Sequence, residues 1–392
     1  MMILEALRAA YGDALLLHYG TAAKPRLAVI DGGPPGVFAD ALKPRLDEIR
    51  EERGLDEATP LDIELMMVSH IDEDHIAGLL QMVRKIKDLR DAKQPVPWRI
   101  RRFWLNSFDD VLGNKDAAIG SGASVMTPSS LGDVLQPEGS LLLASVGQGR
   151  DLRDLLTALN LGGNPPFNSP PFQGMVLAGH PPIILDNLKL TVVAPSRENL
   201  AALQKAWIEK IKPMLQKEKD AAARIRIASY VDSSVYNLSS IVVLVEAQGD
   251  GMKMKRILLT GDGRGDHTLQ GLADAGLLDA KGQIEVDVLK MPHHGSIRDI
   301  DVDYLQKIRA RHFVFSANGK FSNPDLAALK LLSQARPDDN FTIHLTYPPE
   351  DFNAPDVGKA IGAFFAAEKA AGRKYKVEAR KTKDLSFRIK LA

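Results

Sequence analysis

Two histidines and two aspartates lie within six residues of the chain, in the segment Ser69-His70-Ile71-Asp72-Glu73-Asp74-His75-Ile76-Ala77-Gly78. This segment directly follows a continuous apolar run, residues 63–68, which is typical of a strand buried on both faces. Residues 76–89 have helical spacing. A strand end that leads through a loop into a helix can turn all four side chains into one cavity. Imidazole and carboxylate together suit Zn²⁺ or Mn²⁺, so the segment predicts a metal site. The acids alone could instead favour the helix N-terminus, but that explanation leaves the histidines unexplained.

Two later segments repeat the pattern of an apolar strand followed by polar residues. They are Leu258-Leu259-Thr260-Gly261-Asp262-Gly263 and Asp287-Val288-Leu289-Lys290-Met291-Pro292-His293-His294-Gly295-Ser296. An aspartate after a strand is commonly a turn residue, and paired histidines can be surface residues. The three segments together make a shared site the better interpretation.

Composition narrows the class of protein. The 392 residues carry 50 basic and 50 acidic side chains, and a net charge of zero argues against a protein that mainly coats nucleic acid. The absence of cysteine excludes disulfides, thiol nucleophiles and thiolate metal sites. The N-terminal residues lack the features of a signal peptide, and no apolar run is long enough to cross a bilayer. We therefore expect a cytoplasmic protein with no membrane partner.

Strands and helices alternate along the chain, which indicates layered α/β architecture. Two similar halves of strands with helices outside would give a four-layer αββα sandwich. We expect one domain over 1–392, with an irregular insertion at about 108–182 and a C-terminal extension at about 336–392. The insertion, with one expected helix at 151–159, is either a lid that shapes the substrate pocket or a surface excursion. Two hairpins are expected late in the chain, at 239–246 with 254–259 and at 375–379 with 386–389.

The order and spacing of these motifs resemble the metallo-β-lactamase superfamily. The likeness is greatest to the hydrolase domain of ComEC-type DNA-uptake proteins and their stand-alone soluble relatives. It rests on strand–H-x-D-x-D-H–helix at 70–75, strand–TGD at 260–262 and D-V-L-K-x-P-H-H-G-S at 287–296. It extends to Tyr11-Gly12-Asp13-Ala14-Leu15-Leu16-Leu17 and Ile30-Asp31-Gly32-Gly33, and it covers roughly residues 3–335 apart from the insertion.

The resemblance implies a role for each site residue. His70 and Asp72 would bind one metal ion, and Asp74 and His75 would bind a second ion. Asp262 would bridge the two ions. One of the adjacent histidines, His293 or His294, would complete the second site. The catalytic residues would be Asp74, which orients or deprotonates the water, and Asp262. The common superfamily pattern is H-x-H-x-D-H. An aspartate at position 72 therefore makes the first site harder and better suited to Mn²⁺.

Three further residues are candidates for weaker contacts. Relatives usually carry another metal-binding histidine in the region where this chain has Asn237, so that amide is the nearest substitute. Lys290 and Ser296 flank the last motif and could contact an anionic substrate, although a surface lysine and a helix cap are the simpler interpretations of each.

These observations favour a metal-dependent hydrolase that acts on a phosphodiester through a metal-activated water. It would hold one or two divalent ions, Zn²⁺ first and Mn²⁺ as the alternative. The substrate would be a small phosphodiester or a nucleic acid. Two alternatives stay open: an ester, lactone or thioester hydrolase on the same centre, and a non-catalytic binding protein that keeps the scaffold.

Overall fold

The structure is a computed structural model that describes residues 2–107, 137–206, 237–249 and 253–391. Within these ranges, one mixed sheet has six strands in the order β16–β1–β2–β3–β5–β7. They are β1 (Met2–Leu7), β2 (Leu15–Gly20), β3 (Pro25–Ile30), β5 (Leu65–Met67), β7 (Phe103–Trp104) and β16 (Ser386–Leu391). The strands from β16 to β3 are antiparallel, and β3, β5 and β7 are parallel.

The second mixed sheet has eight described strands in the order β15–β14–β13–β12–β11–β10–β9–β8. They are β8 (Ile183–Leu185), β9 (Leu188–Ala194), β10 (Val242–Gln248), β11 (Met254–Leu259), β12 (Ile284–Lys290), β13 (Ile308–Phe315), β14 (Thr342–Leu345) and β15 (Lys376–Ala379). Pairing is antiparallel from β8 to β11 and parallel from β11 to β15. The predicted hairpin of β10 and β11 is confirmed.

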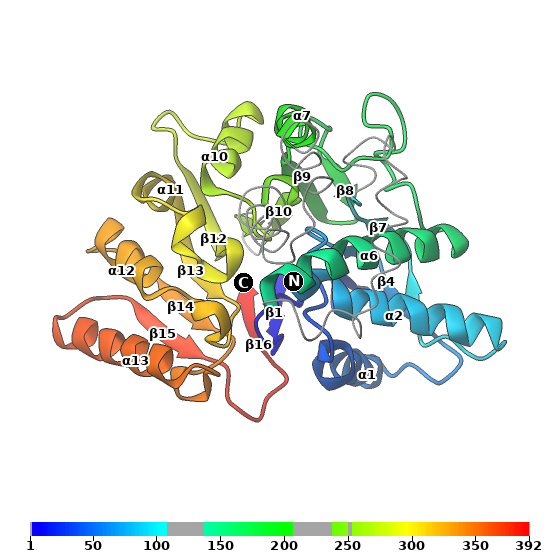
Figure 1. Ribbon diagram of the computed structural model, residues 1–392, viewed down its shortest axis with the longest axis horizontal. Coiled ribbons are helices and arrows are strands. Elements are labelled where there is room, and N and C mark those ends of the chain that lie inside the picture. The colour runs from blue at the N-terminus through cyan, green and yellow to red at the C-terminus, as the bar shows by residue number, and fades with distance from the viewer. Residues whose placement is uncertain (1, 108–136, 207–236, 250–252, 392) are drawn as a thin grey trace, which may run out of the picture.

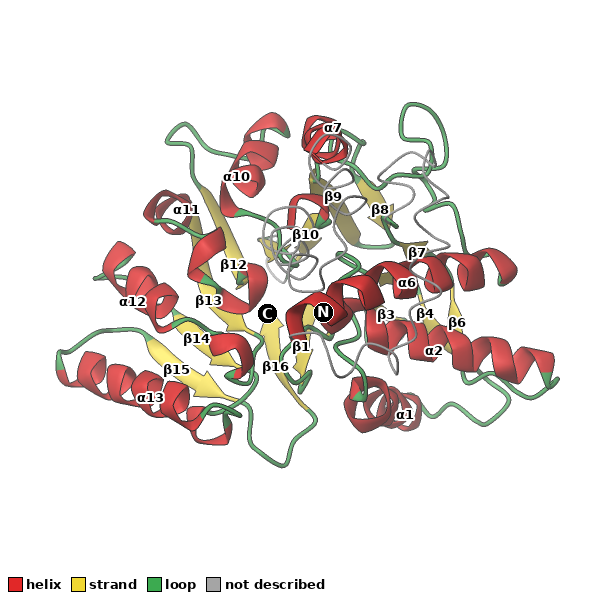
Figure 2. Ribbon diagram, viewed as in Figure 1, coloured by secondary structure: helices red, strands yellow, loops and turns green. Residues whose placement is uncertain are grey.

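Helices lie on the outer face of each sheet, with the strands between them (Figures 1 and 2). They are α1 (Lys43–Glu52), α2 (Glu73–Asp91), α6 (Pro137–Ala158), α7 (Arg197–Ala206), α10 (Gly265–Asp274), α11 (Val302–Lys307), α12 (Leu326–Ala335) and α13 (Pro355–Ala370). Figure 1 shows α10 to α13 on the left and α1, α2 and α6 on the right. Among the described helices, none combines the length and apolar character that a bilayer crossing requires.

Three apolar clusters fill the spaces between the four layers. Strand β2 is buried along its whole length because Leu16 packs toward the helices and Leu17 packs toward the other sheet. Strand β10 is buried except at its last residue, with Val243 facing the first sheet and Leu244 facing the helices on its own side. The predicted α/β sandwich of four layers, αββα, is thus confirmed, and it explains why apolar residues predominate on both faces of these strands.

Two expectations about strands are wrong. The run 63–68 is two strands, β4 (Leu61–Ile63) and β5, which break at Glu64 and enter different sheets; β4 pairs with β6 (Trp98–Ile100). The carboxylate of Glu64 pairs with Arg26 at 2.7 Å at the break. The expected closing hairpin does not form either, because β15 joins the second sheet and β16 pairs with β1 of the first.

The described part of the 108–182 segment is built into the core. Helix α6 begins well before the expected 151 and buries Leu152 and Leu156 against the first sheet's helical layer. Phe167 and Val176 enter the cluster between the sheets. Residues 108–136 lie outside the described residues, and the role of the segment in shaping a substrate pocket stays a prediction.

Candidate metal centre

The first motif lies where β5 leads into α2. Asp72 is the N-cap residue of α2, and Asp74 and His75 lie in its first turn. His70 lies in the loop before the helix, and its side chain is fully buried. The predicted sequence of strand, loop and helix therefore puts all four side chains at one end of the first sheet.

The second motif comes from the facing sheet and packs tightly against the first. Gly261 follows β11 with a φ of +49°, and a Cβ at this position would lie 2.7 Å from the Cβ of Ser69. Only glycine fits both this conformation and this close approach. The next residue, Asp262, is thereby brought beside His70 and His75, and its backbone N–H donates to Ser240 Oγ at 3.2 Å.

The third motif follows β12, and its two histidines have a left-handed backbone conformation that turns their side chains toward the other motifs. His293 and His294 have φ values of +47° and +56°, a region that non-glycine residues rarely adopt. The Nδ1 atom of His294 lies 2.9 Å from the carbonyl oxygen of Ser316, so this nitrogen carries the proton. In the neutral ring, Nε2 then has a lone pair that faces the site.

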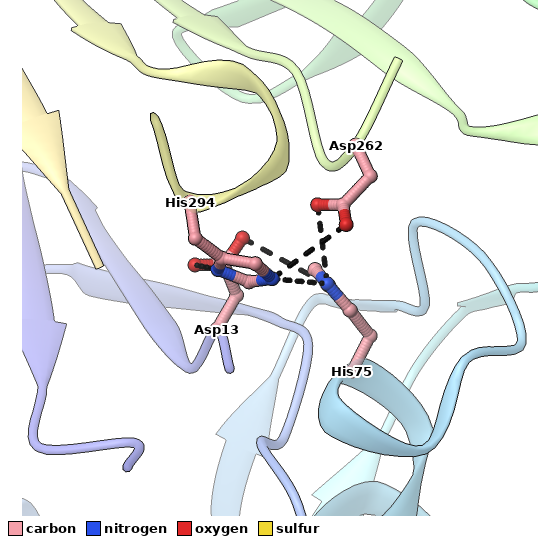
Figure 3. Close-up of side chains that lie close together, drawn as sticks. All are labelled: Asp13, His75, Asp262 and His294. Atoms are coloured by element: carbon pink, nitrogen blue, oxygen red, sulfur yellow. Dashed lines mark hydrogen bonds and ion pairs between the residues drawn. The ribbon is translucent and has the colours of Figure 1, made fainter. Parts of the chain in front are cut away.

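Asp13, His75, Asp262 and His294 form a buried group whose ligand atoms all lie within 4.8 Å of one another (Figure 3). The Nε2 atom of His75 lies 3.2 Å from Asp262 Oδ1 and 3.2 Å from His294 Nε2. Two imidazole nitrogens on one tetrahedral zinc ion are about 3.3 Å apart, given bond lengths of about 2.05 Å. This group could bind a metal ion.

The facing imidazoles strengthen this fit. His75 Nδ1 lies 2.9 Å from the carboxylate of Asp31 and therefore carries its proton, as His294 Nδ1 does. In the neutral rings the two Nε2 lone pairs then point at each other, which is unfavourable unless a cation or an extra proton lies between them. The donor set and its arrangement are therefore compatible with a bound cation.

Asp262 joins this group to a second set of donors. Its Oδ2 atom lies 3.8 Å from His70 Nε2 and 3.8 Å from His293 Nε2. His70 Nε2 also lies 3.2 Å from Asp72 Oδ2. The described residues offer no hydrogen-bond partner to three buried atoms of this set, His70 Nε2, Asp72 Oδ1 and Asp262 Oδ1. Buried polar atoms without partners are rare in folded proteins, and metal coordination would satisfy them.

Asp74 lies on the other side of the centre, at its more open end. Its Oδ2 atom is 3.1 Å from His294 Nε2. The side chains of Asp74, Asp72 and His293 are 21, 16 and 27 % exposed, whereas those of His75 and Asp262 are at most 3 % exposed. The centre therefore opens toward solvent on the side of these three residues.

The buried histidines and carboxylates of the centre shift one another's pKa. Burial opposes the charged form of His294, but the carboxylates of Asp262 and Asp13 outweigh it and raise its pKa to about 10. Burial likewise opposes charge on His75, while Asp262, Asp31 and Asp74 hold its pKa well above the ordinary value. Burial would raise the pKa of Asp262, yet the surrounding histidines keep it well below its usual range. The cavity thus favours positive charge among its carboxylates, which a divalent cation would supply.

Two acids important for the centre were missed by the sequence analysis. Asp13 lies beside the Nδ1 edges of both buried histidines, 3.5 Å from His294 and 3.8 Å from His75. Asp31 holds His75 and also accepts from the backbone N–H and hydroxyl of Ser69, at 2.7 and 2.8 Å. The available signal was the position of each acid beside an apolar run, Asp13 before β2 and Asp31 directly after β3, which by itself indicates only a turn.

The three residues predicted to make weaker contacts with substrate or metal are Lys290, Ser296 and Asn237. Lys290 is buried, with its Nζ atom 2.5 Å from Asp13 Oδ2, and it donates to the carbonyl of Met291. Ser296 caps the 3₁₀ turn Ile297–Asp299 by accepting from the backbone N–H of Arg298. Asn237 begins the 3₁₀ turn Asn237–Ser239, and its side chain lies outside the described residues.

No protein-family model and no curated protein sequence matches this chain. Among solved structures, the chain is similar to the crystal structure of the metallo-β-lactamase MIM-1 from Novosphingobium pentaromativorans. The match has 13 % sequence identity and a TM-score of 0.26, and it covers 94 % of this chain and 93 % of that chain.

Proposed function

We propose that this protein is a metal-dependent hydrolase that cleaves phosphodiesters with an activated water molecule. The observation that carries the proposal is the buried convergence of His75, His294 and Asp262, with the lone pairs of two imidazoles directed at one point. A divalent ion bound there would supply Lewis-acid activation of a water molecule and of a phosphoryl oxygen.

Two donor sets support one or two ions. The first is His75, His294, Asp74 and Asp262, whose contacting atoms are 3.1 to 3.9 Å apart. The second is His70, Asp72, Asp262 and His293, with separations of 3.2 to 3.8 Å. Asp262 belongs to both sets and would bridge them.

Carboxylates outnumber nearby fixed cations, which favours hard ions and a substrate that brings its own negative charge to them. Lys290 offsets the charge of Asp13, but Asp72, Asp74 and Asp262 have no lysine or arginine partner within 4 Å among the described residues. Such a site suits Mn²⁺ as well as Zn²⁺. Asp74 is partly exposed at the mouth of the centre and would orient an incoming water or accept its proton.

The test combines metal analysis of the purified protein with hydrolysis of bis-p-nitrophenyl phosphate, short DNA and RNA, and lactones. We expect one or two ions per chain and phosphodiester hydrolysis that Asp262→Ala abolishes. Asp266→Ala is a matched control, because this exposed acid lies four residues after Asp262 and pairs with the side chain of Arg264 and the backbone N–H of His267. Hydrolysis of lactones alone would favour the ester hydrolase. Protein that binds no ion and gains no thermal stability from Zn²⁺ or Mn²⁺ would favour the non-catalytic binding protein.

A further inference from the structure

An exposed aromatic side chain, Phe321, packs on Tyr11, which directly precedes the Gly12-Asp13 segment of the candidate metal centre. Phe321 is 47 % exposed and lies in the 3₁₀ turn Lys320–Ser322, between β13 and α12. Its ring meets that of Tyr11 edge-on, with centroids 5.5 Å apart. The ammonium of Lys320 lies 3.6 Å from the Tyr11 ring centroid and 4.8 Å from that of Phe321. We call Tyr11, Lys320 and Phe321 the rim cluster.

The turn holds this arrangement at a conformational cost. Phe321 and Ser322 have φ values of +56° and +65°, a region that residues with a side chain rarely adopt because the Cβ crowds the following carbonyl oxygen. The backbone N–H of Lys320 is bound by Asn318 Oδ1, and that of Gly319 by the carbonyl of Asn323. A turn fixed in this way presents a large apolar ring to solvent instead of burying it.

The rim cluster is fixed to the metal centre through the backbone. Tyr11 precedes Gly12, which packs so closely on Asp74 that a Cβ at Gly12 would lie 1.9 Å from the Asp74 carbonyl oxygen. The backbone N–H of Asp13 donates to that same oxygen at 3.1 Å. The hydroxyl of Ser316, whose carbonyl holds His294, donates to the Gly12 carbonyl at 2.7 Å.

Electrostatics agree with this placement. Burial raises the pKa of Tyr11 above its ordinary value, and the carboxylates of Glu73 and Asp74 raise it further. Lys320 in turn acts on Glu73, whose pKa burial and Asp74 raise. The side chain of Tyr11 therefore lies close to Glu73 and Asp74, in agreement with the packing of Gly12 on Asp74.

A cation between aromatic rings, next to a hydrolytic centre, has a specific chemical complement. The ammonium attracts a phosphate oxygen, and an exposed aromatic face stacks on a nucleobase regardless of its identity. We infer that the rim cluster binds the base and phosphate of a nucleotide-containing phosphodiester, with Phe321 stacking on the base and Lys320 contacting the phosphate. The inference rests on the proposed function, because it places the scissile phosphate at the metal centre.

Two substrates with the same leaving group isolate the contribution of the base. Thymidine 5′-(p-nitrophenyl) phosphate carries a base, and methyl p-nitrophenyl phosphate does not. We expect Phe321→Ala to lower kcat/KM for the thymidine ester about tenfold, mainly through KM, because stacking on one base contributes about 1–3 kcal/mol. The kcat/KM of Phe321→Ala for the methyl ester should change less than about twofold. Lys320→Ala should lower kcat/KM for both substrates, because both carry the phosphate that the ammonium contacts. Controls are Ile184→Ala, an exposed apolar residue of β8, and Lys330→Ala, an exposed lysine of α12.

Equilibrium binding gives a readout that does not depend on hydrolysis. Isothermal titration with thymidine 5′-monophosphate should show about tenfold weaker binding to Phe321→Ala, whereas binding of inorganic phosphate should be unchanged. Metal content should match that of the unmodified protein in both rim variants. Comparison of the dinucleotide TpT with a thymidine decamer distinguishes a small nucleotide from a single strand as the source of the base. Phe321→Ala should weaken binding of the preferred ligand, and unchanged binding would overturn the base site.

The outcomes separate the two proposals. If the unmodified protein hydrolyses both esters but Phe321→Ala changes their ratio by less than twofold and leaves monophosphate binding intact, the rim inference is overturned and the proposed function stands. If neither ester is hydrolysed with Zn²⁺ or Mn²⁺, the phosphodiesterase proposal fails. The titration then still decides whether Phe321 binds a nucleotide.

Discussion

Lys290 and Asp13 form a buried ion pair behind the metal centre, with Nζ 2.5 Å from Oδ2 and both side chains 1 % exposed. Lys290 ends β12, directly before the histidine turn, and Asp13 lies in the loop before β2. Burial would raise the pKa of Asp13, but Lys290 and then His294 hold it below its usual range. The carboxylate of Asp13 therefore stays ionised beside the Nδ1 atoms of His75 and His294, and Lys290 balances its charge on the other side.

Replacing Lys290 by methionine leaves Asp13 buried without its cation. Loss of one partner of a buried ion pair costs about 3–5 kcal/mol, so we expect Lys290→Met to lower the free energy of unfolding by this amount. The double variant Asp13→Asn/Lys290→Met removes both charges and should recover much of the loss. Urea unfolding of the single and double variants measures the coupling. Additive losses in the double variant would show that the two side chains do not stabilise each other.

Asp262→Ala should lower metal occupancy and activity more than Asn237→Ala. Asp262 contacts both donor sets, whereas an amide is a neutral and weaker ligand. Metal analysis after dialysis, together with hydrolysis of bis-p-nitrophenyl phosphate, compares the two variants. Equal losses would identify Asn237 as a principal ligand and would reverse this ranking.

The fold could be predicted from the sequence where the signal is local. Strands such as β2 and β10 begin with runs of apolar residues because they lie between a helical layer and a second sheet, and this burial shows in the sequence. The sheet that a strand joins depends instead on distant partners. Local pattern could not show that β15 pairs with β14 while β16 pairs with β1, or that Glu64 separates two strands of different sheets.

The site shows the same division. His75, Asp262 and His294 were singled out because each lies close after an apolar strand and belongs to a dense motif, and the structure brings their side chains within 3.2 to 3.6 Å of one another. Their roles as ligands stay predictions. Asp13 and Lys290 were not recognised as partners, since each is an isolated charge in the sequence and their pairing depends on the packing of the two sheets.

Divalent ions should stabilise the protein against heat. An ion that binds only the folded state at about 100 times its Kd adds about 2.7 kcal/mol to the free energy of unfolding. We expect Zn²⁺ or Mn²⁺ to raise the Tm of EDTA-treated protein by several degrees, and His75→Ala to abolish the increase. Differential scanning calorimetry measures the shift. Mg²⁺ at the same concentration is a useful comparison, because this ion dehydrates reluctantly and favours oxygen ligands. An equal increase in the His75→Ala protein would place the stabilising ion elsewhere.

Phe167→Ala should destabilise the fold although the residue lies in the 108–182 segment. Its ring is fully buried against Trp104 and Phe172, and truncation of a buried phenylalanine costs about 3–5 kcal/mol. Chemical unfolding should report this loss with metal content unchanged. Ile184→Ala, at a position that is 63 % exposed, should cost less than about 0.5 kcal/mol. A Phe167→Ala protein as stable as the control would mean that this segment contributes little to the core.

His344 should make stability depend on mildly acidic pH. Burial, and then the charge of His312 at 2.9 Å, lowers the pKa of His344 to about 4, whereas an unfolded histidine titrates near 6.5. Between these values the unfolded chain binds more protons than the folded one, so this contribution is complete above about pH 6.5 and is lost as pH falls toward 4. A shift of this size corresponds to about 3 kcal/mol at most. His344→Gln stays neutral, so its free energy of unfolding should fall less steeply with acid than that of the unmodified protein over this range. Urea unfolding at half-unit pH steps measures both slopes. Parallel curves would show that His344 does not carry this pH dependence.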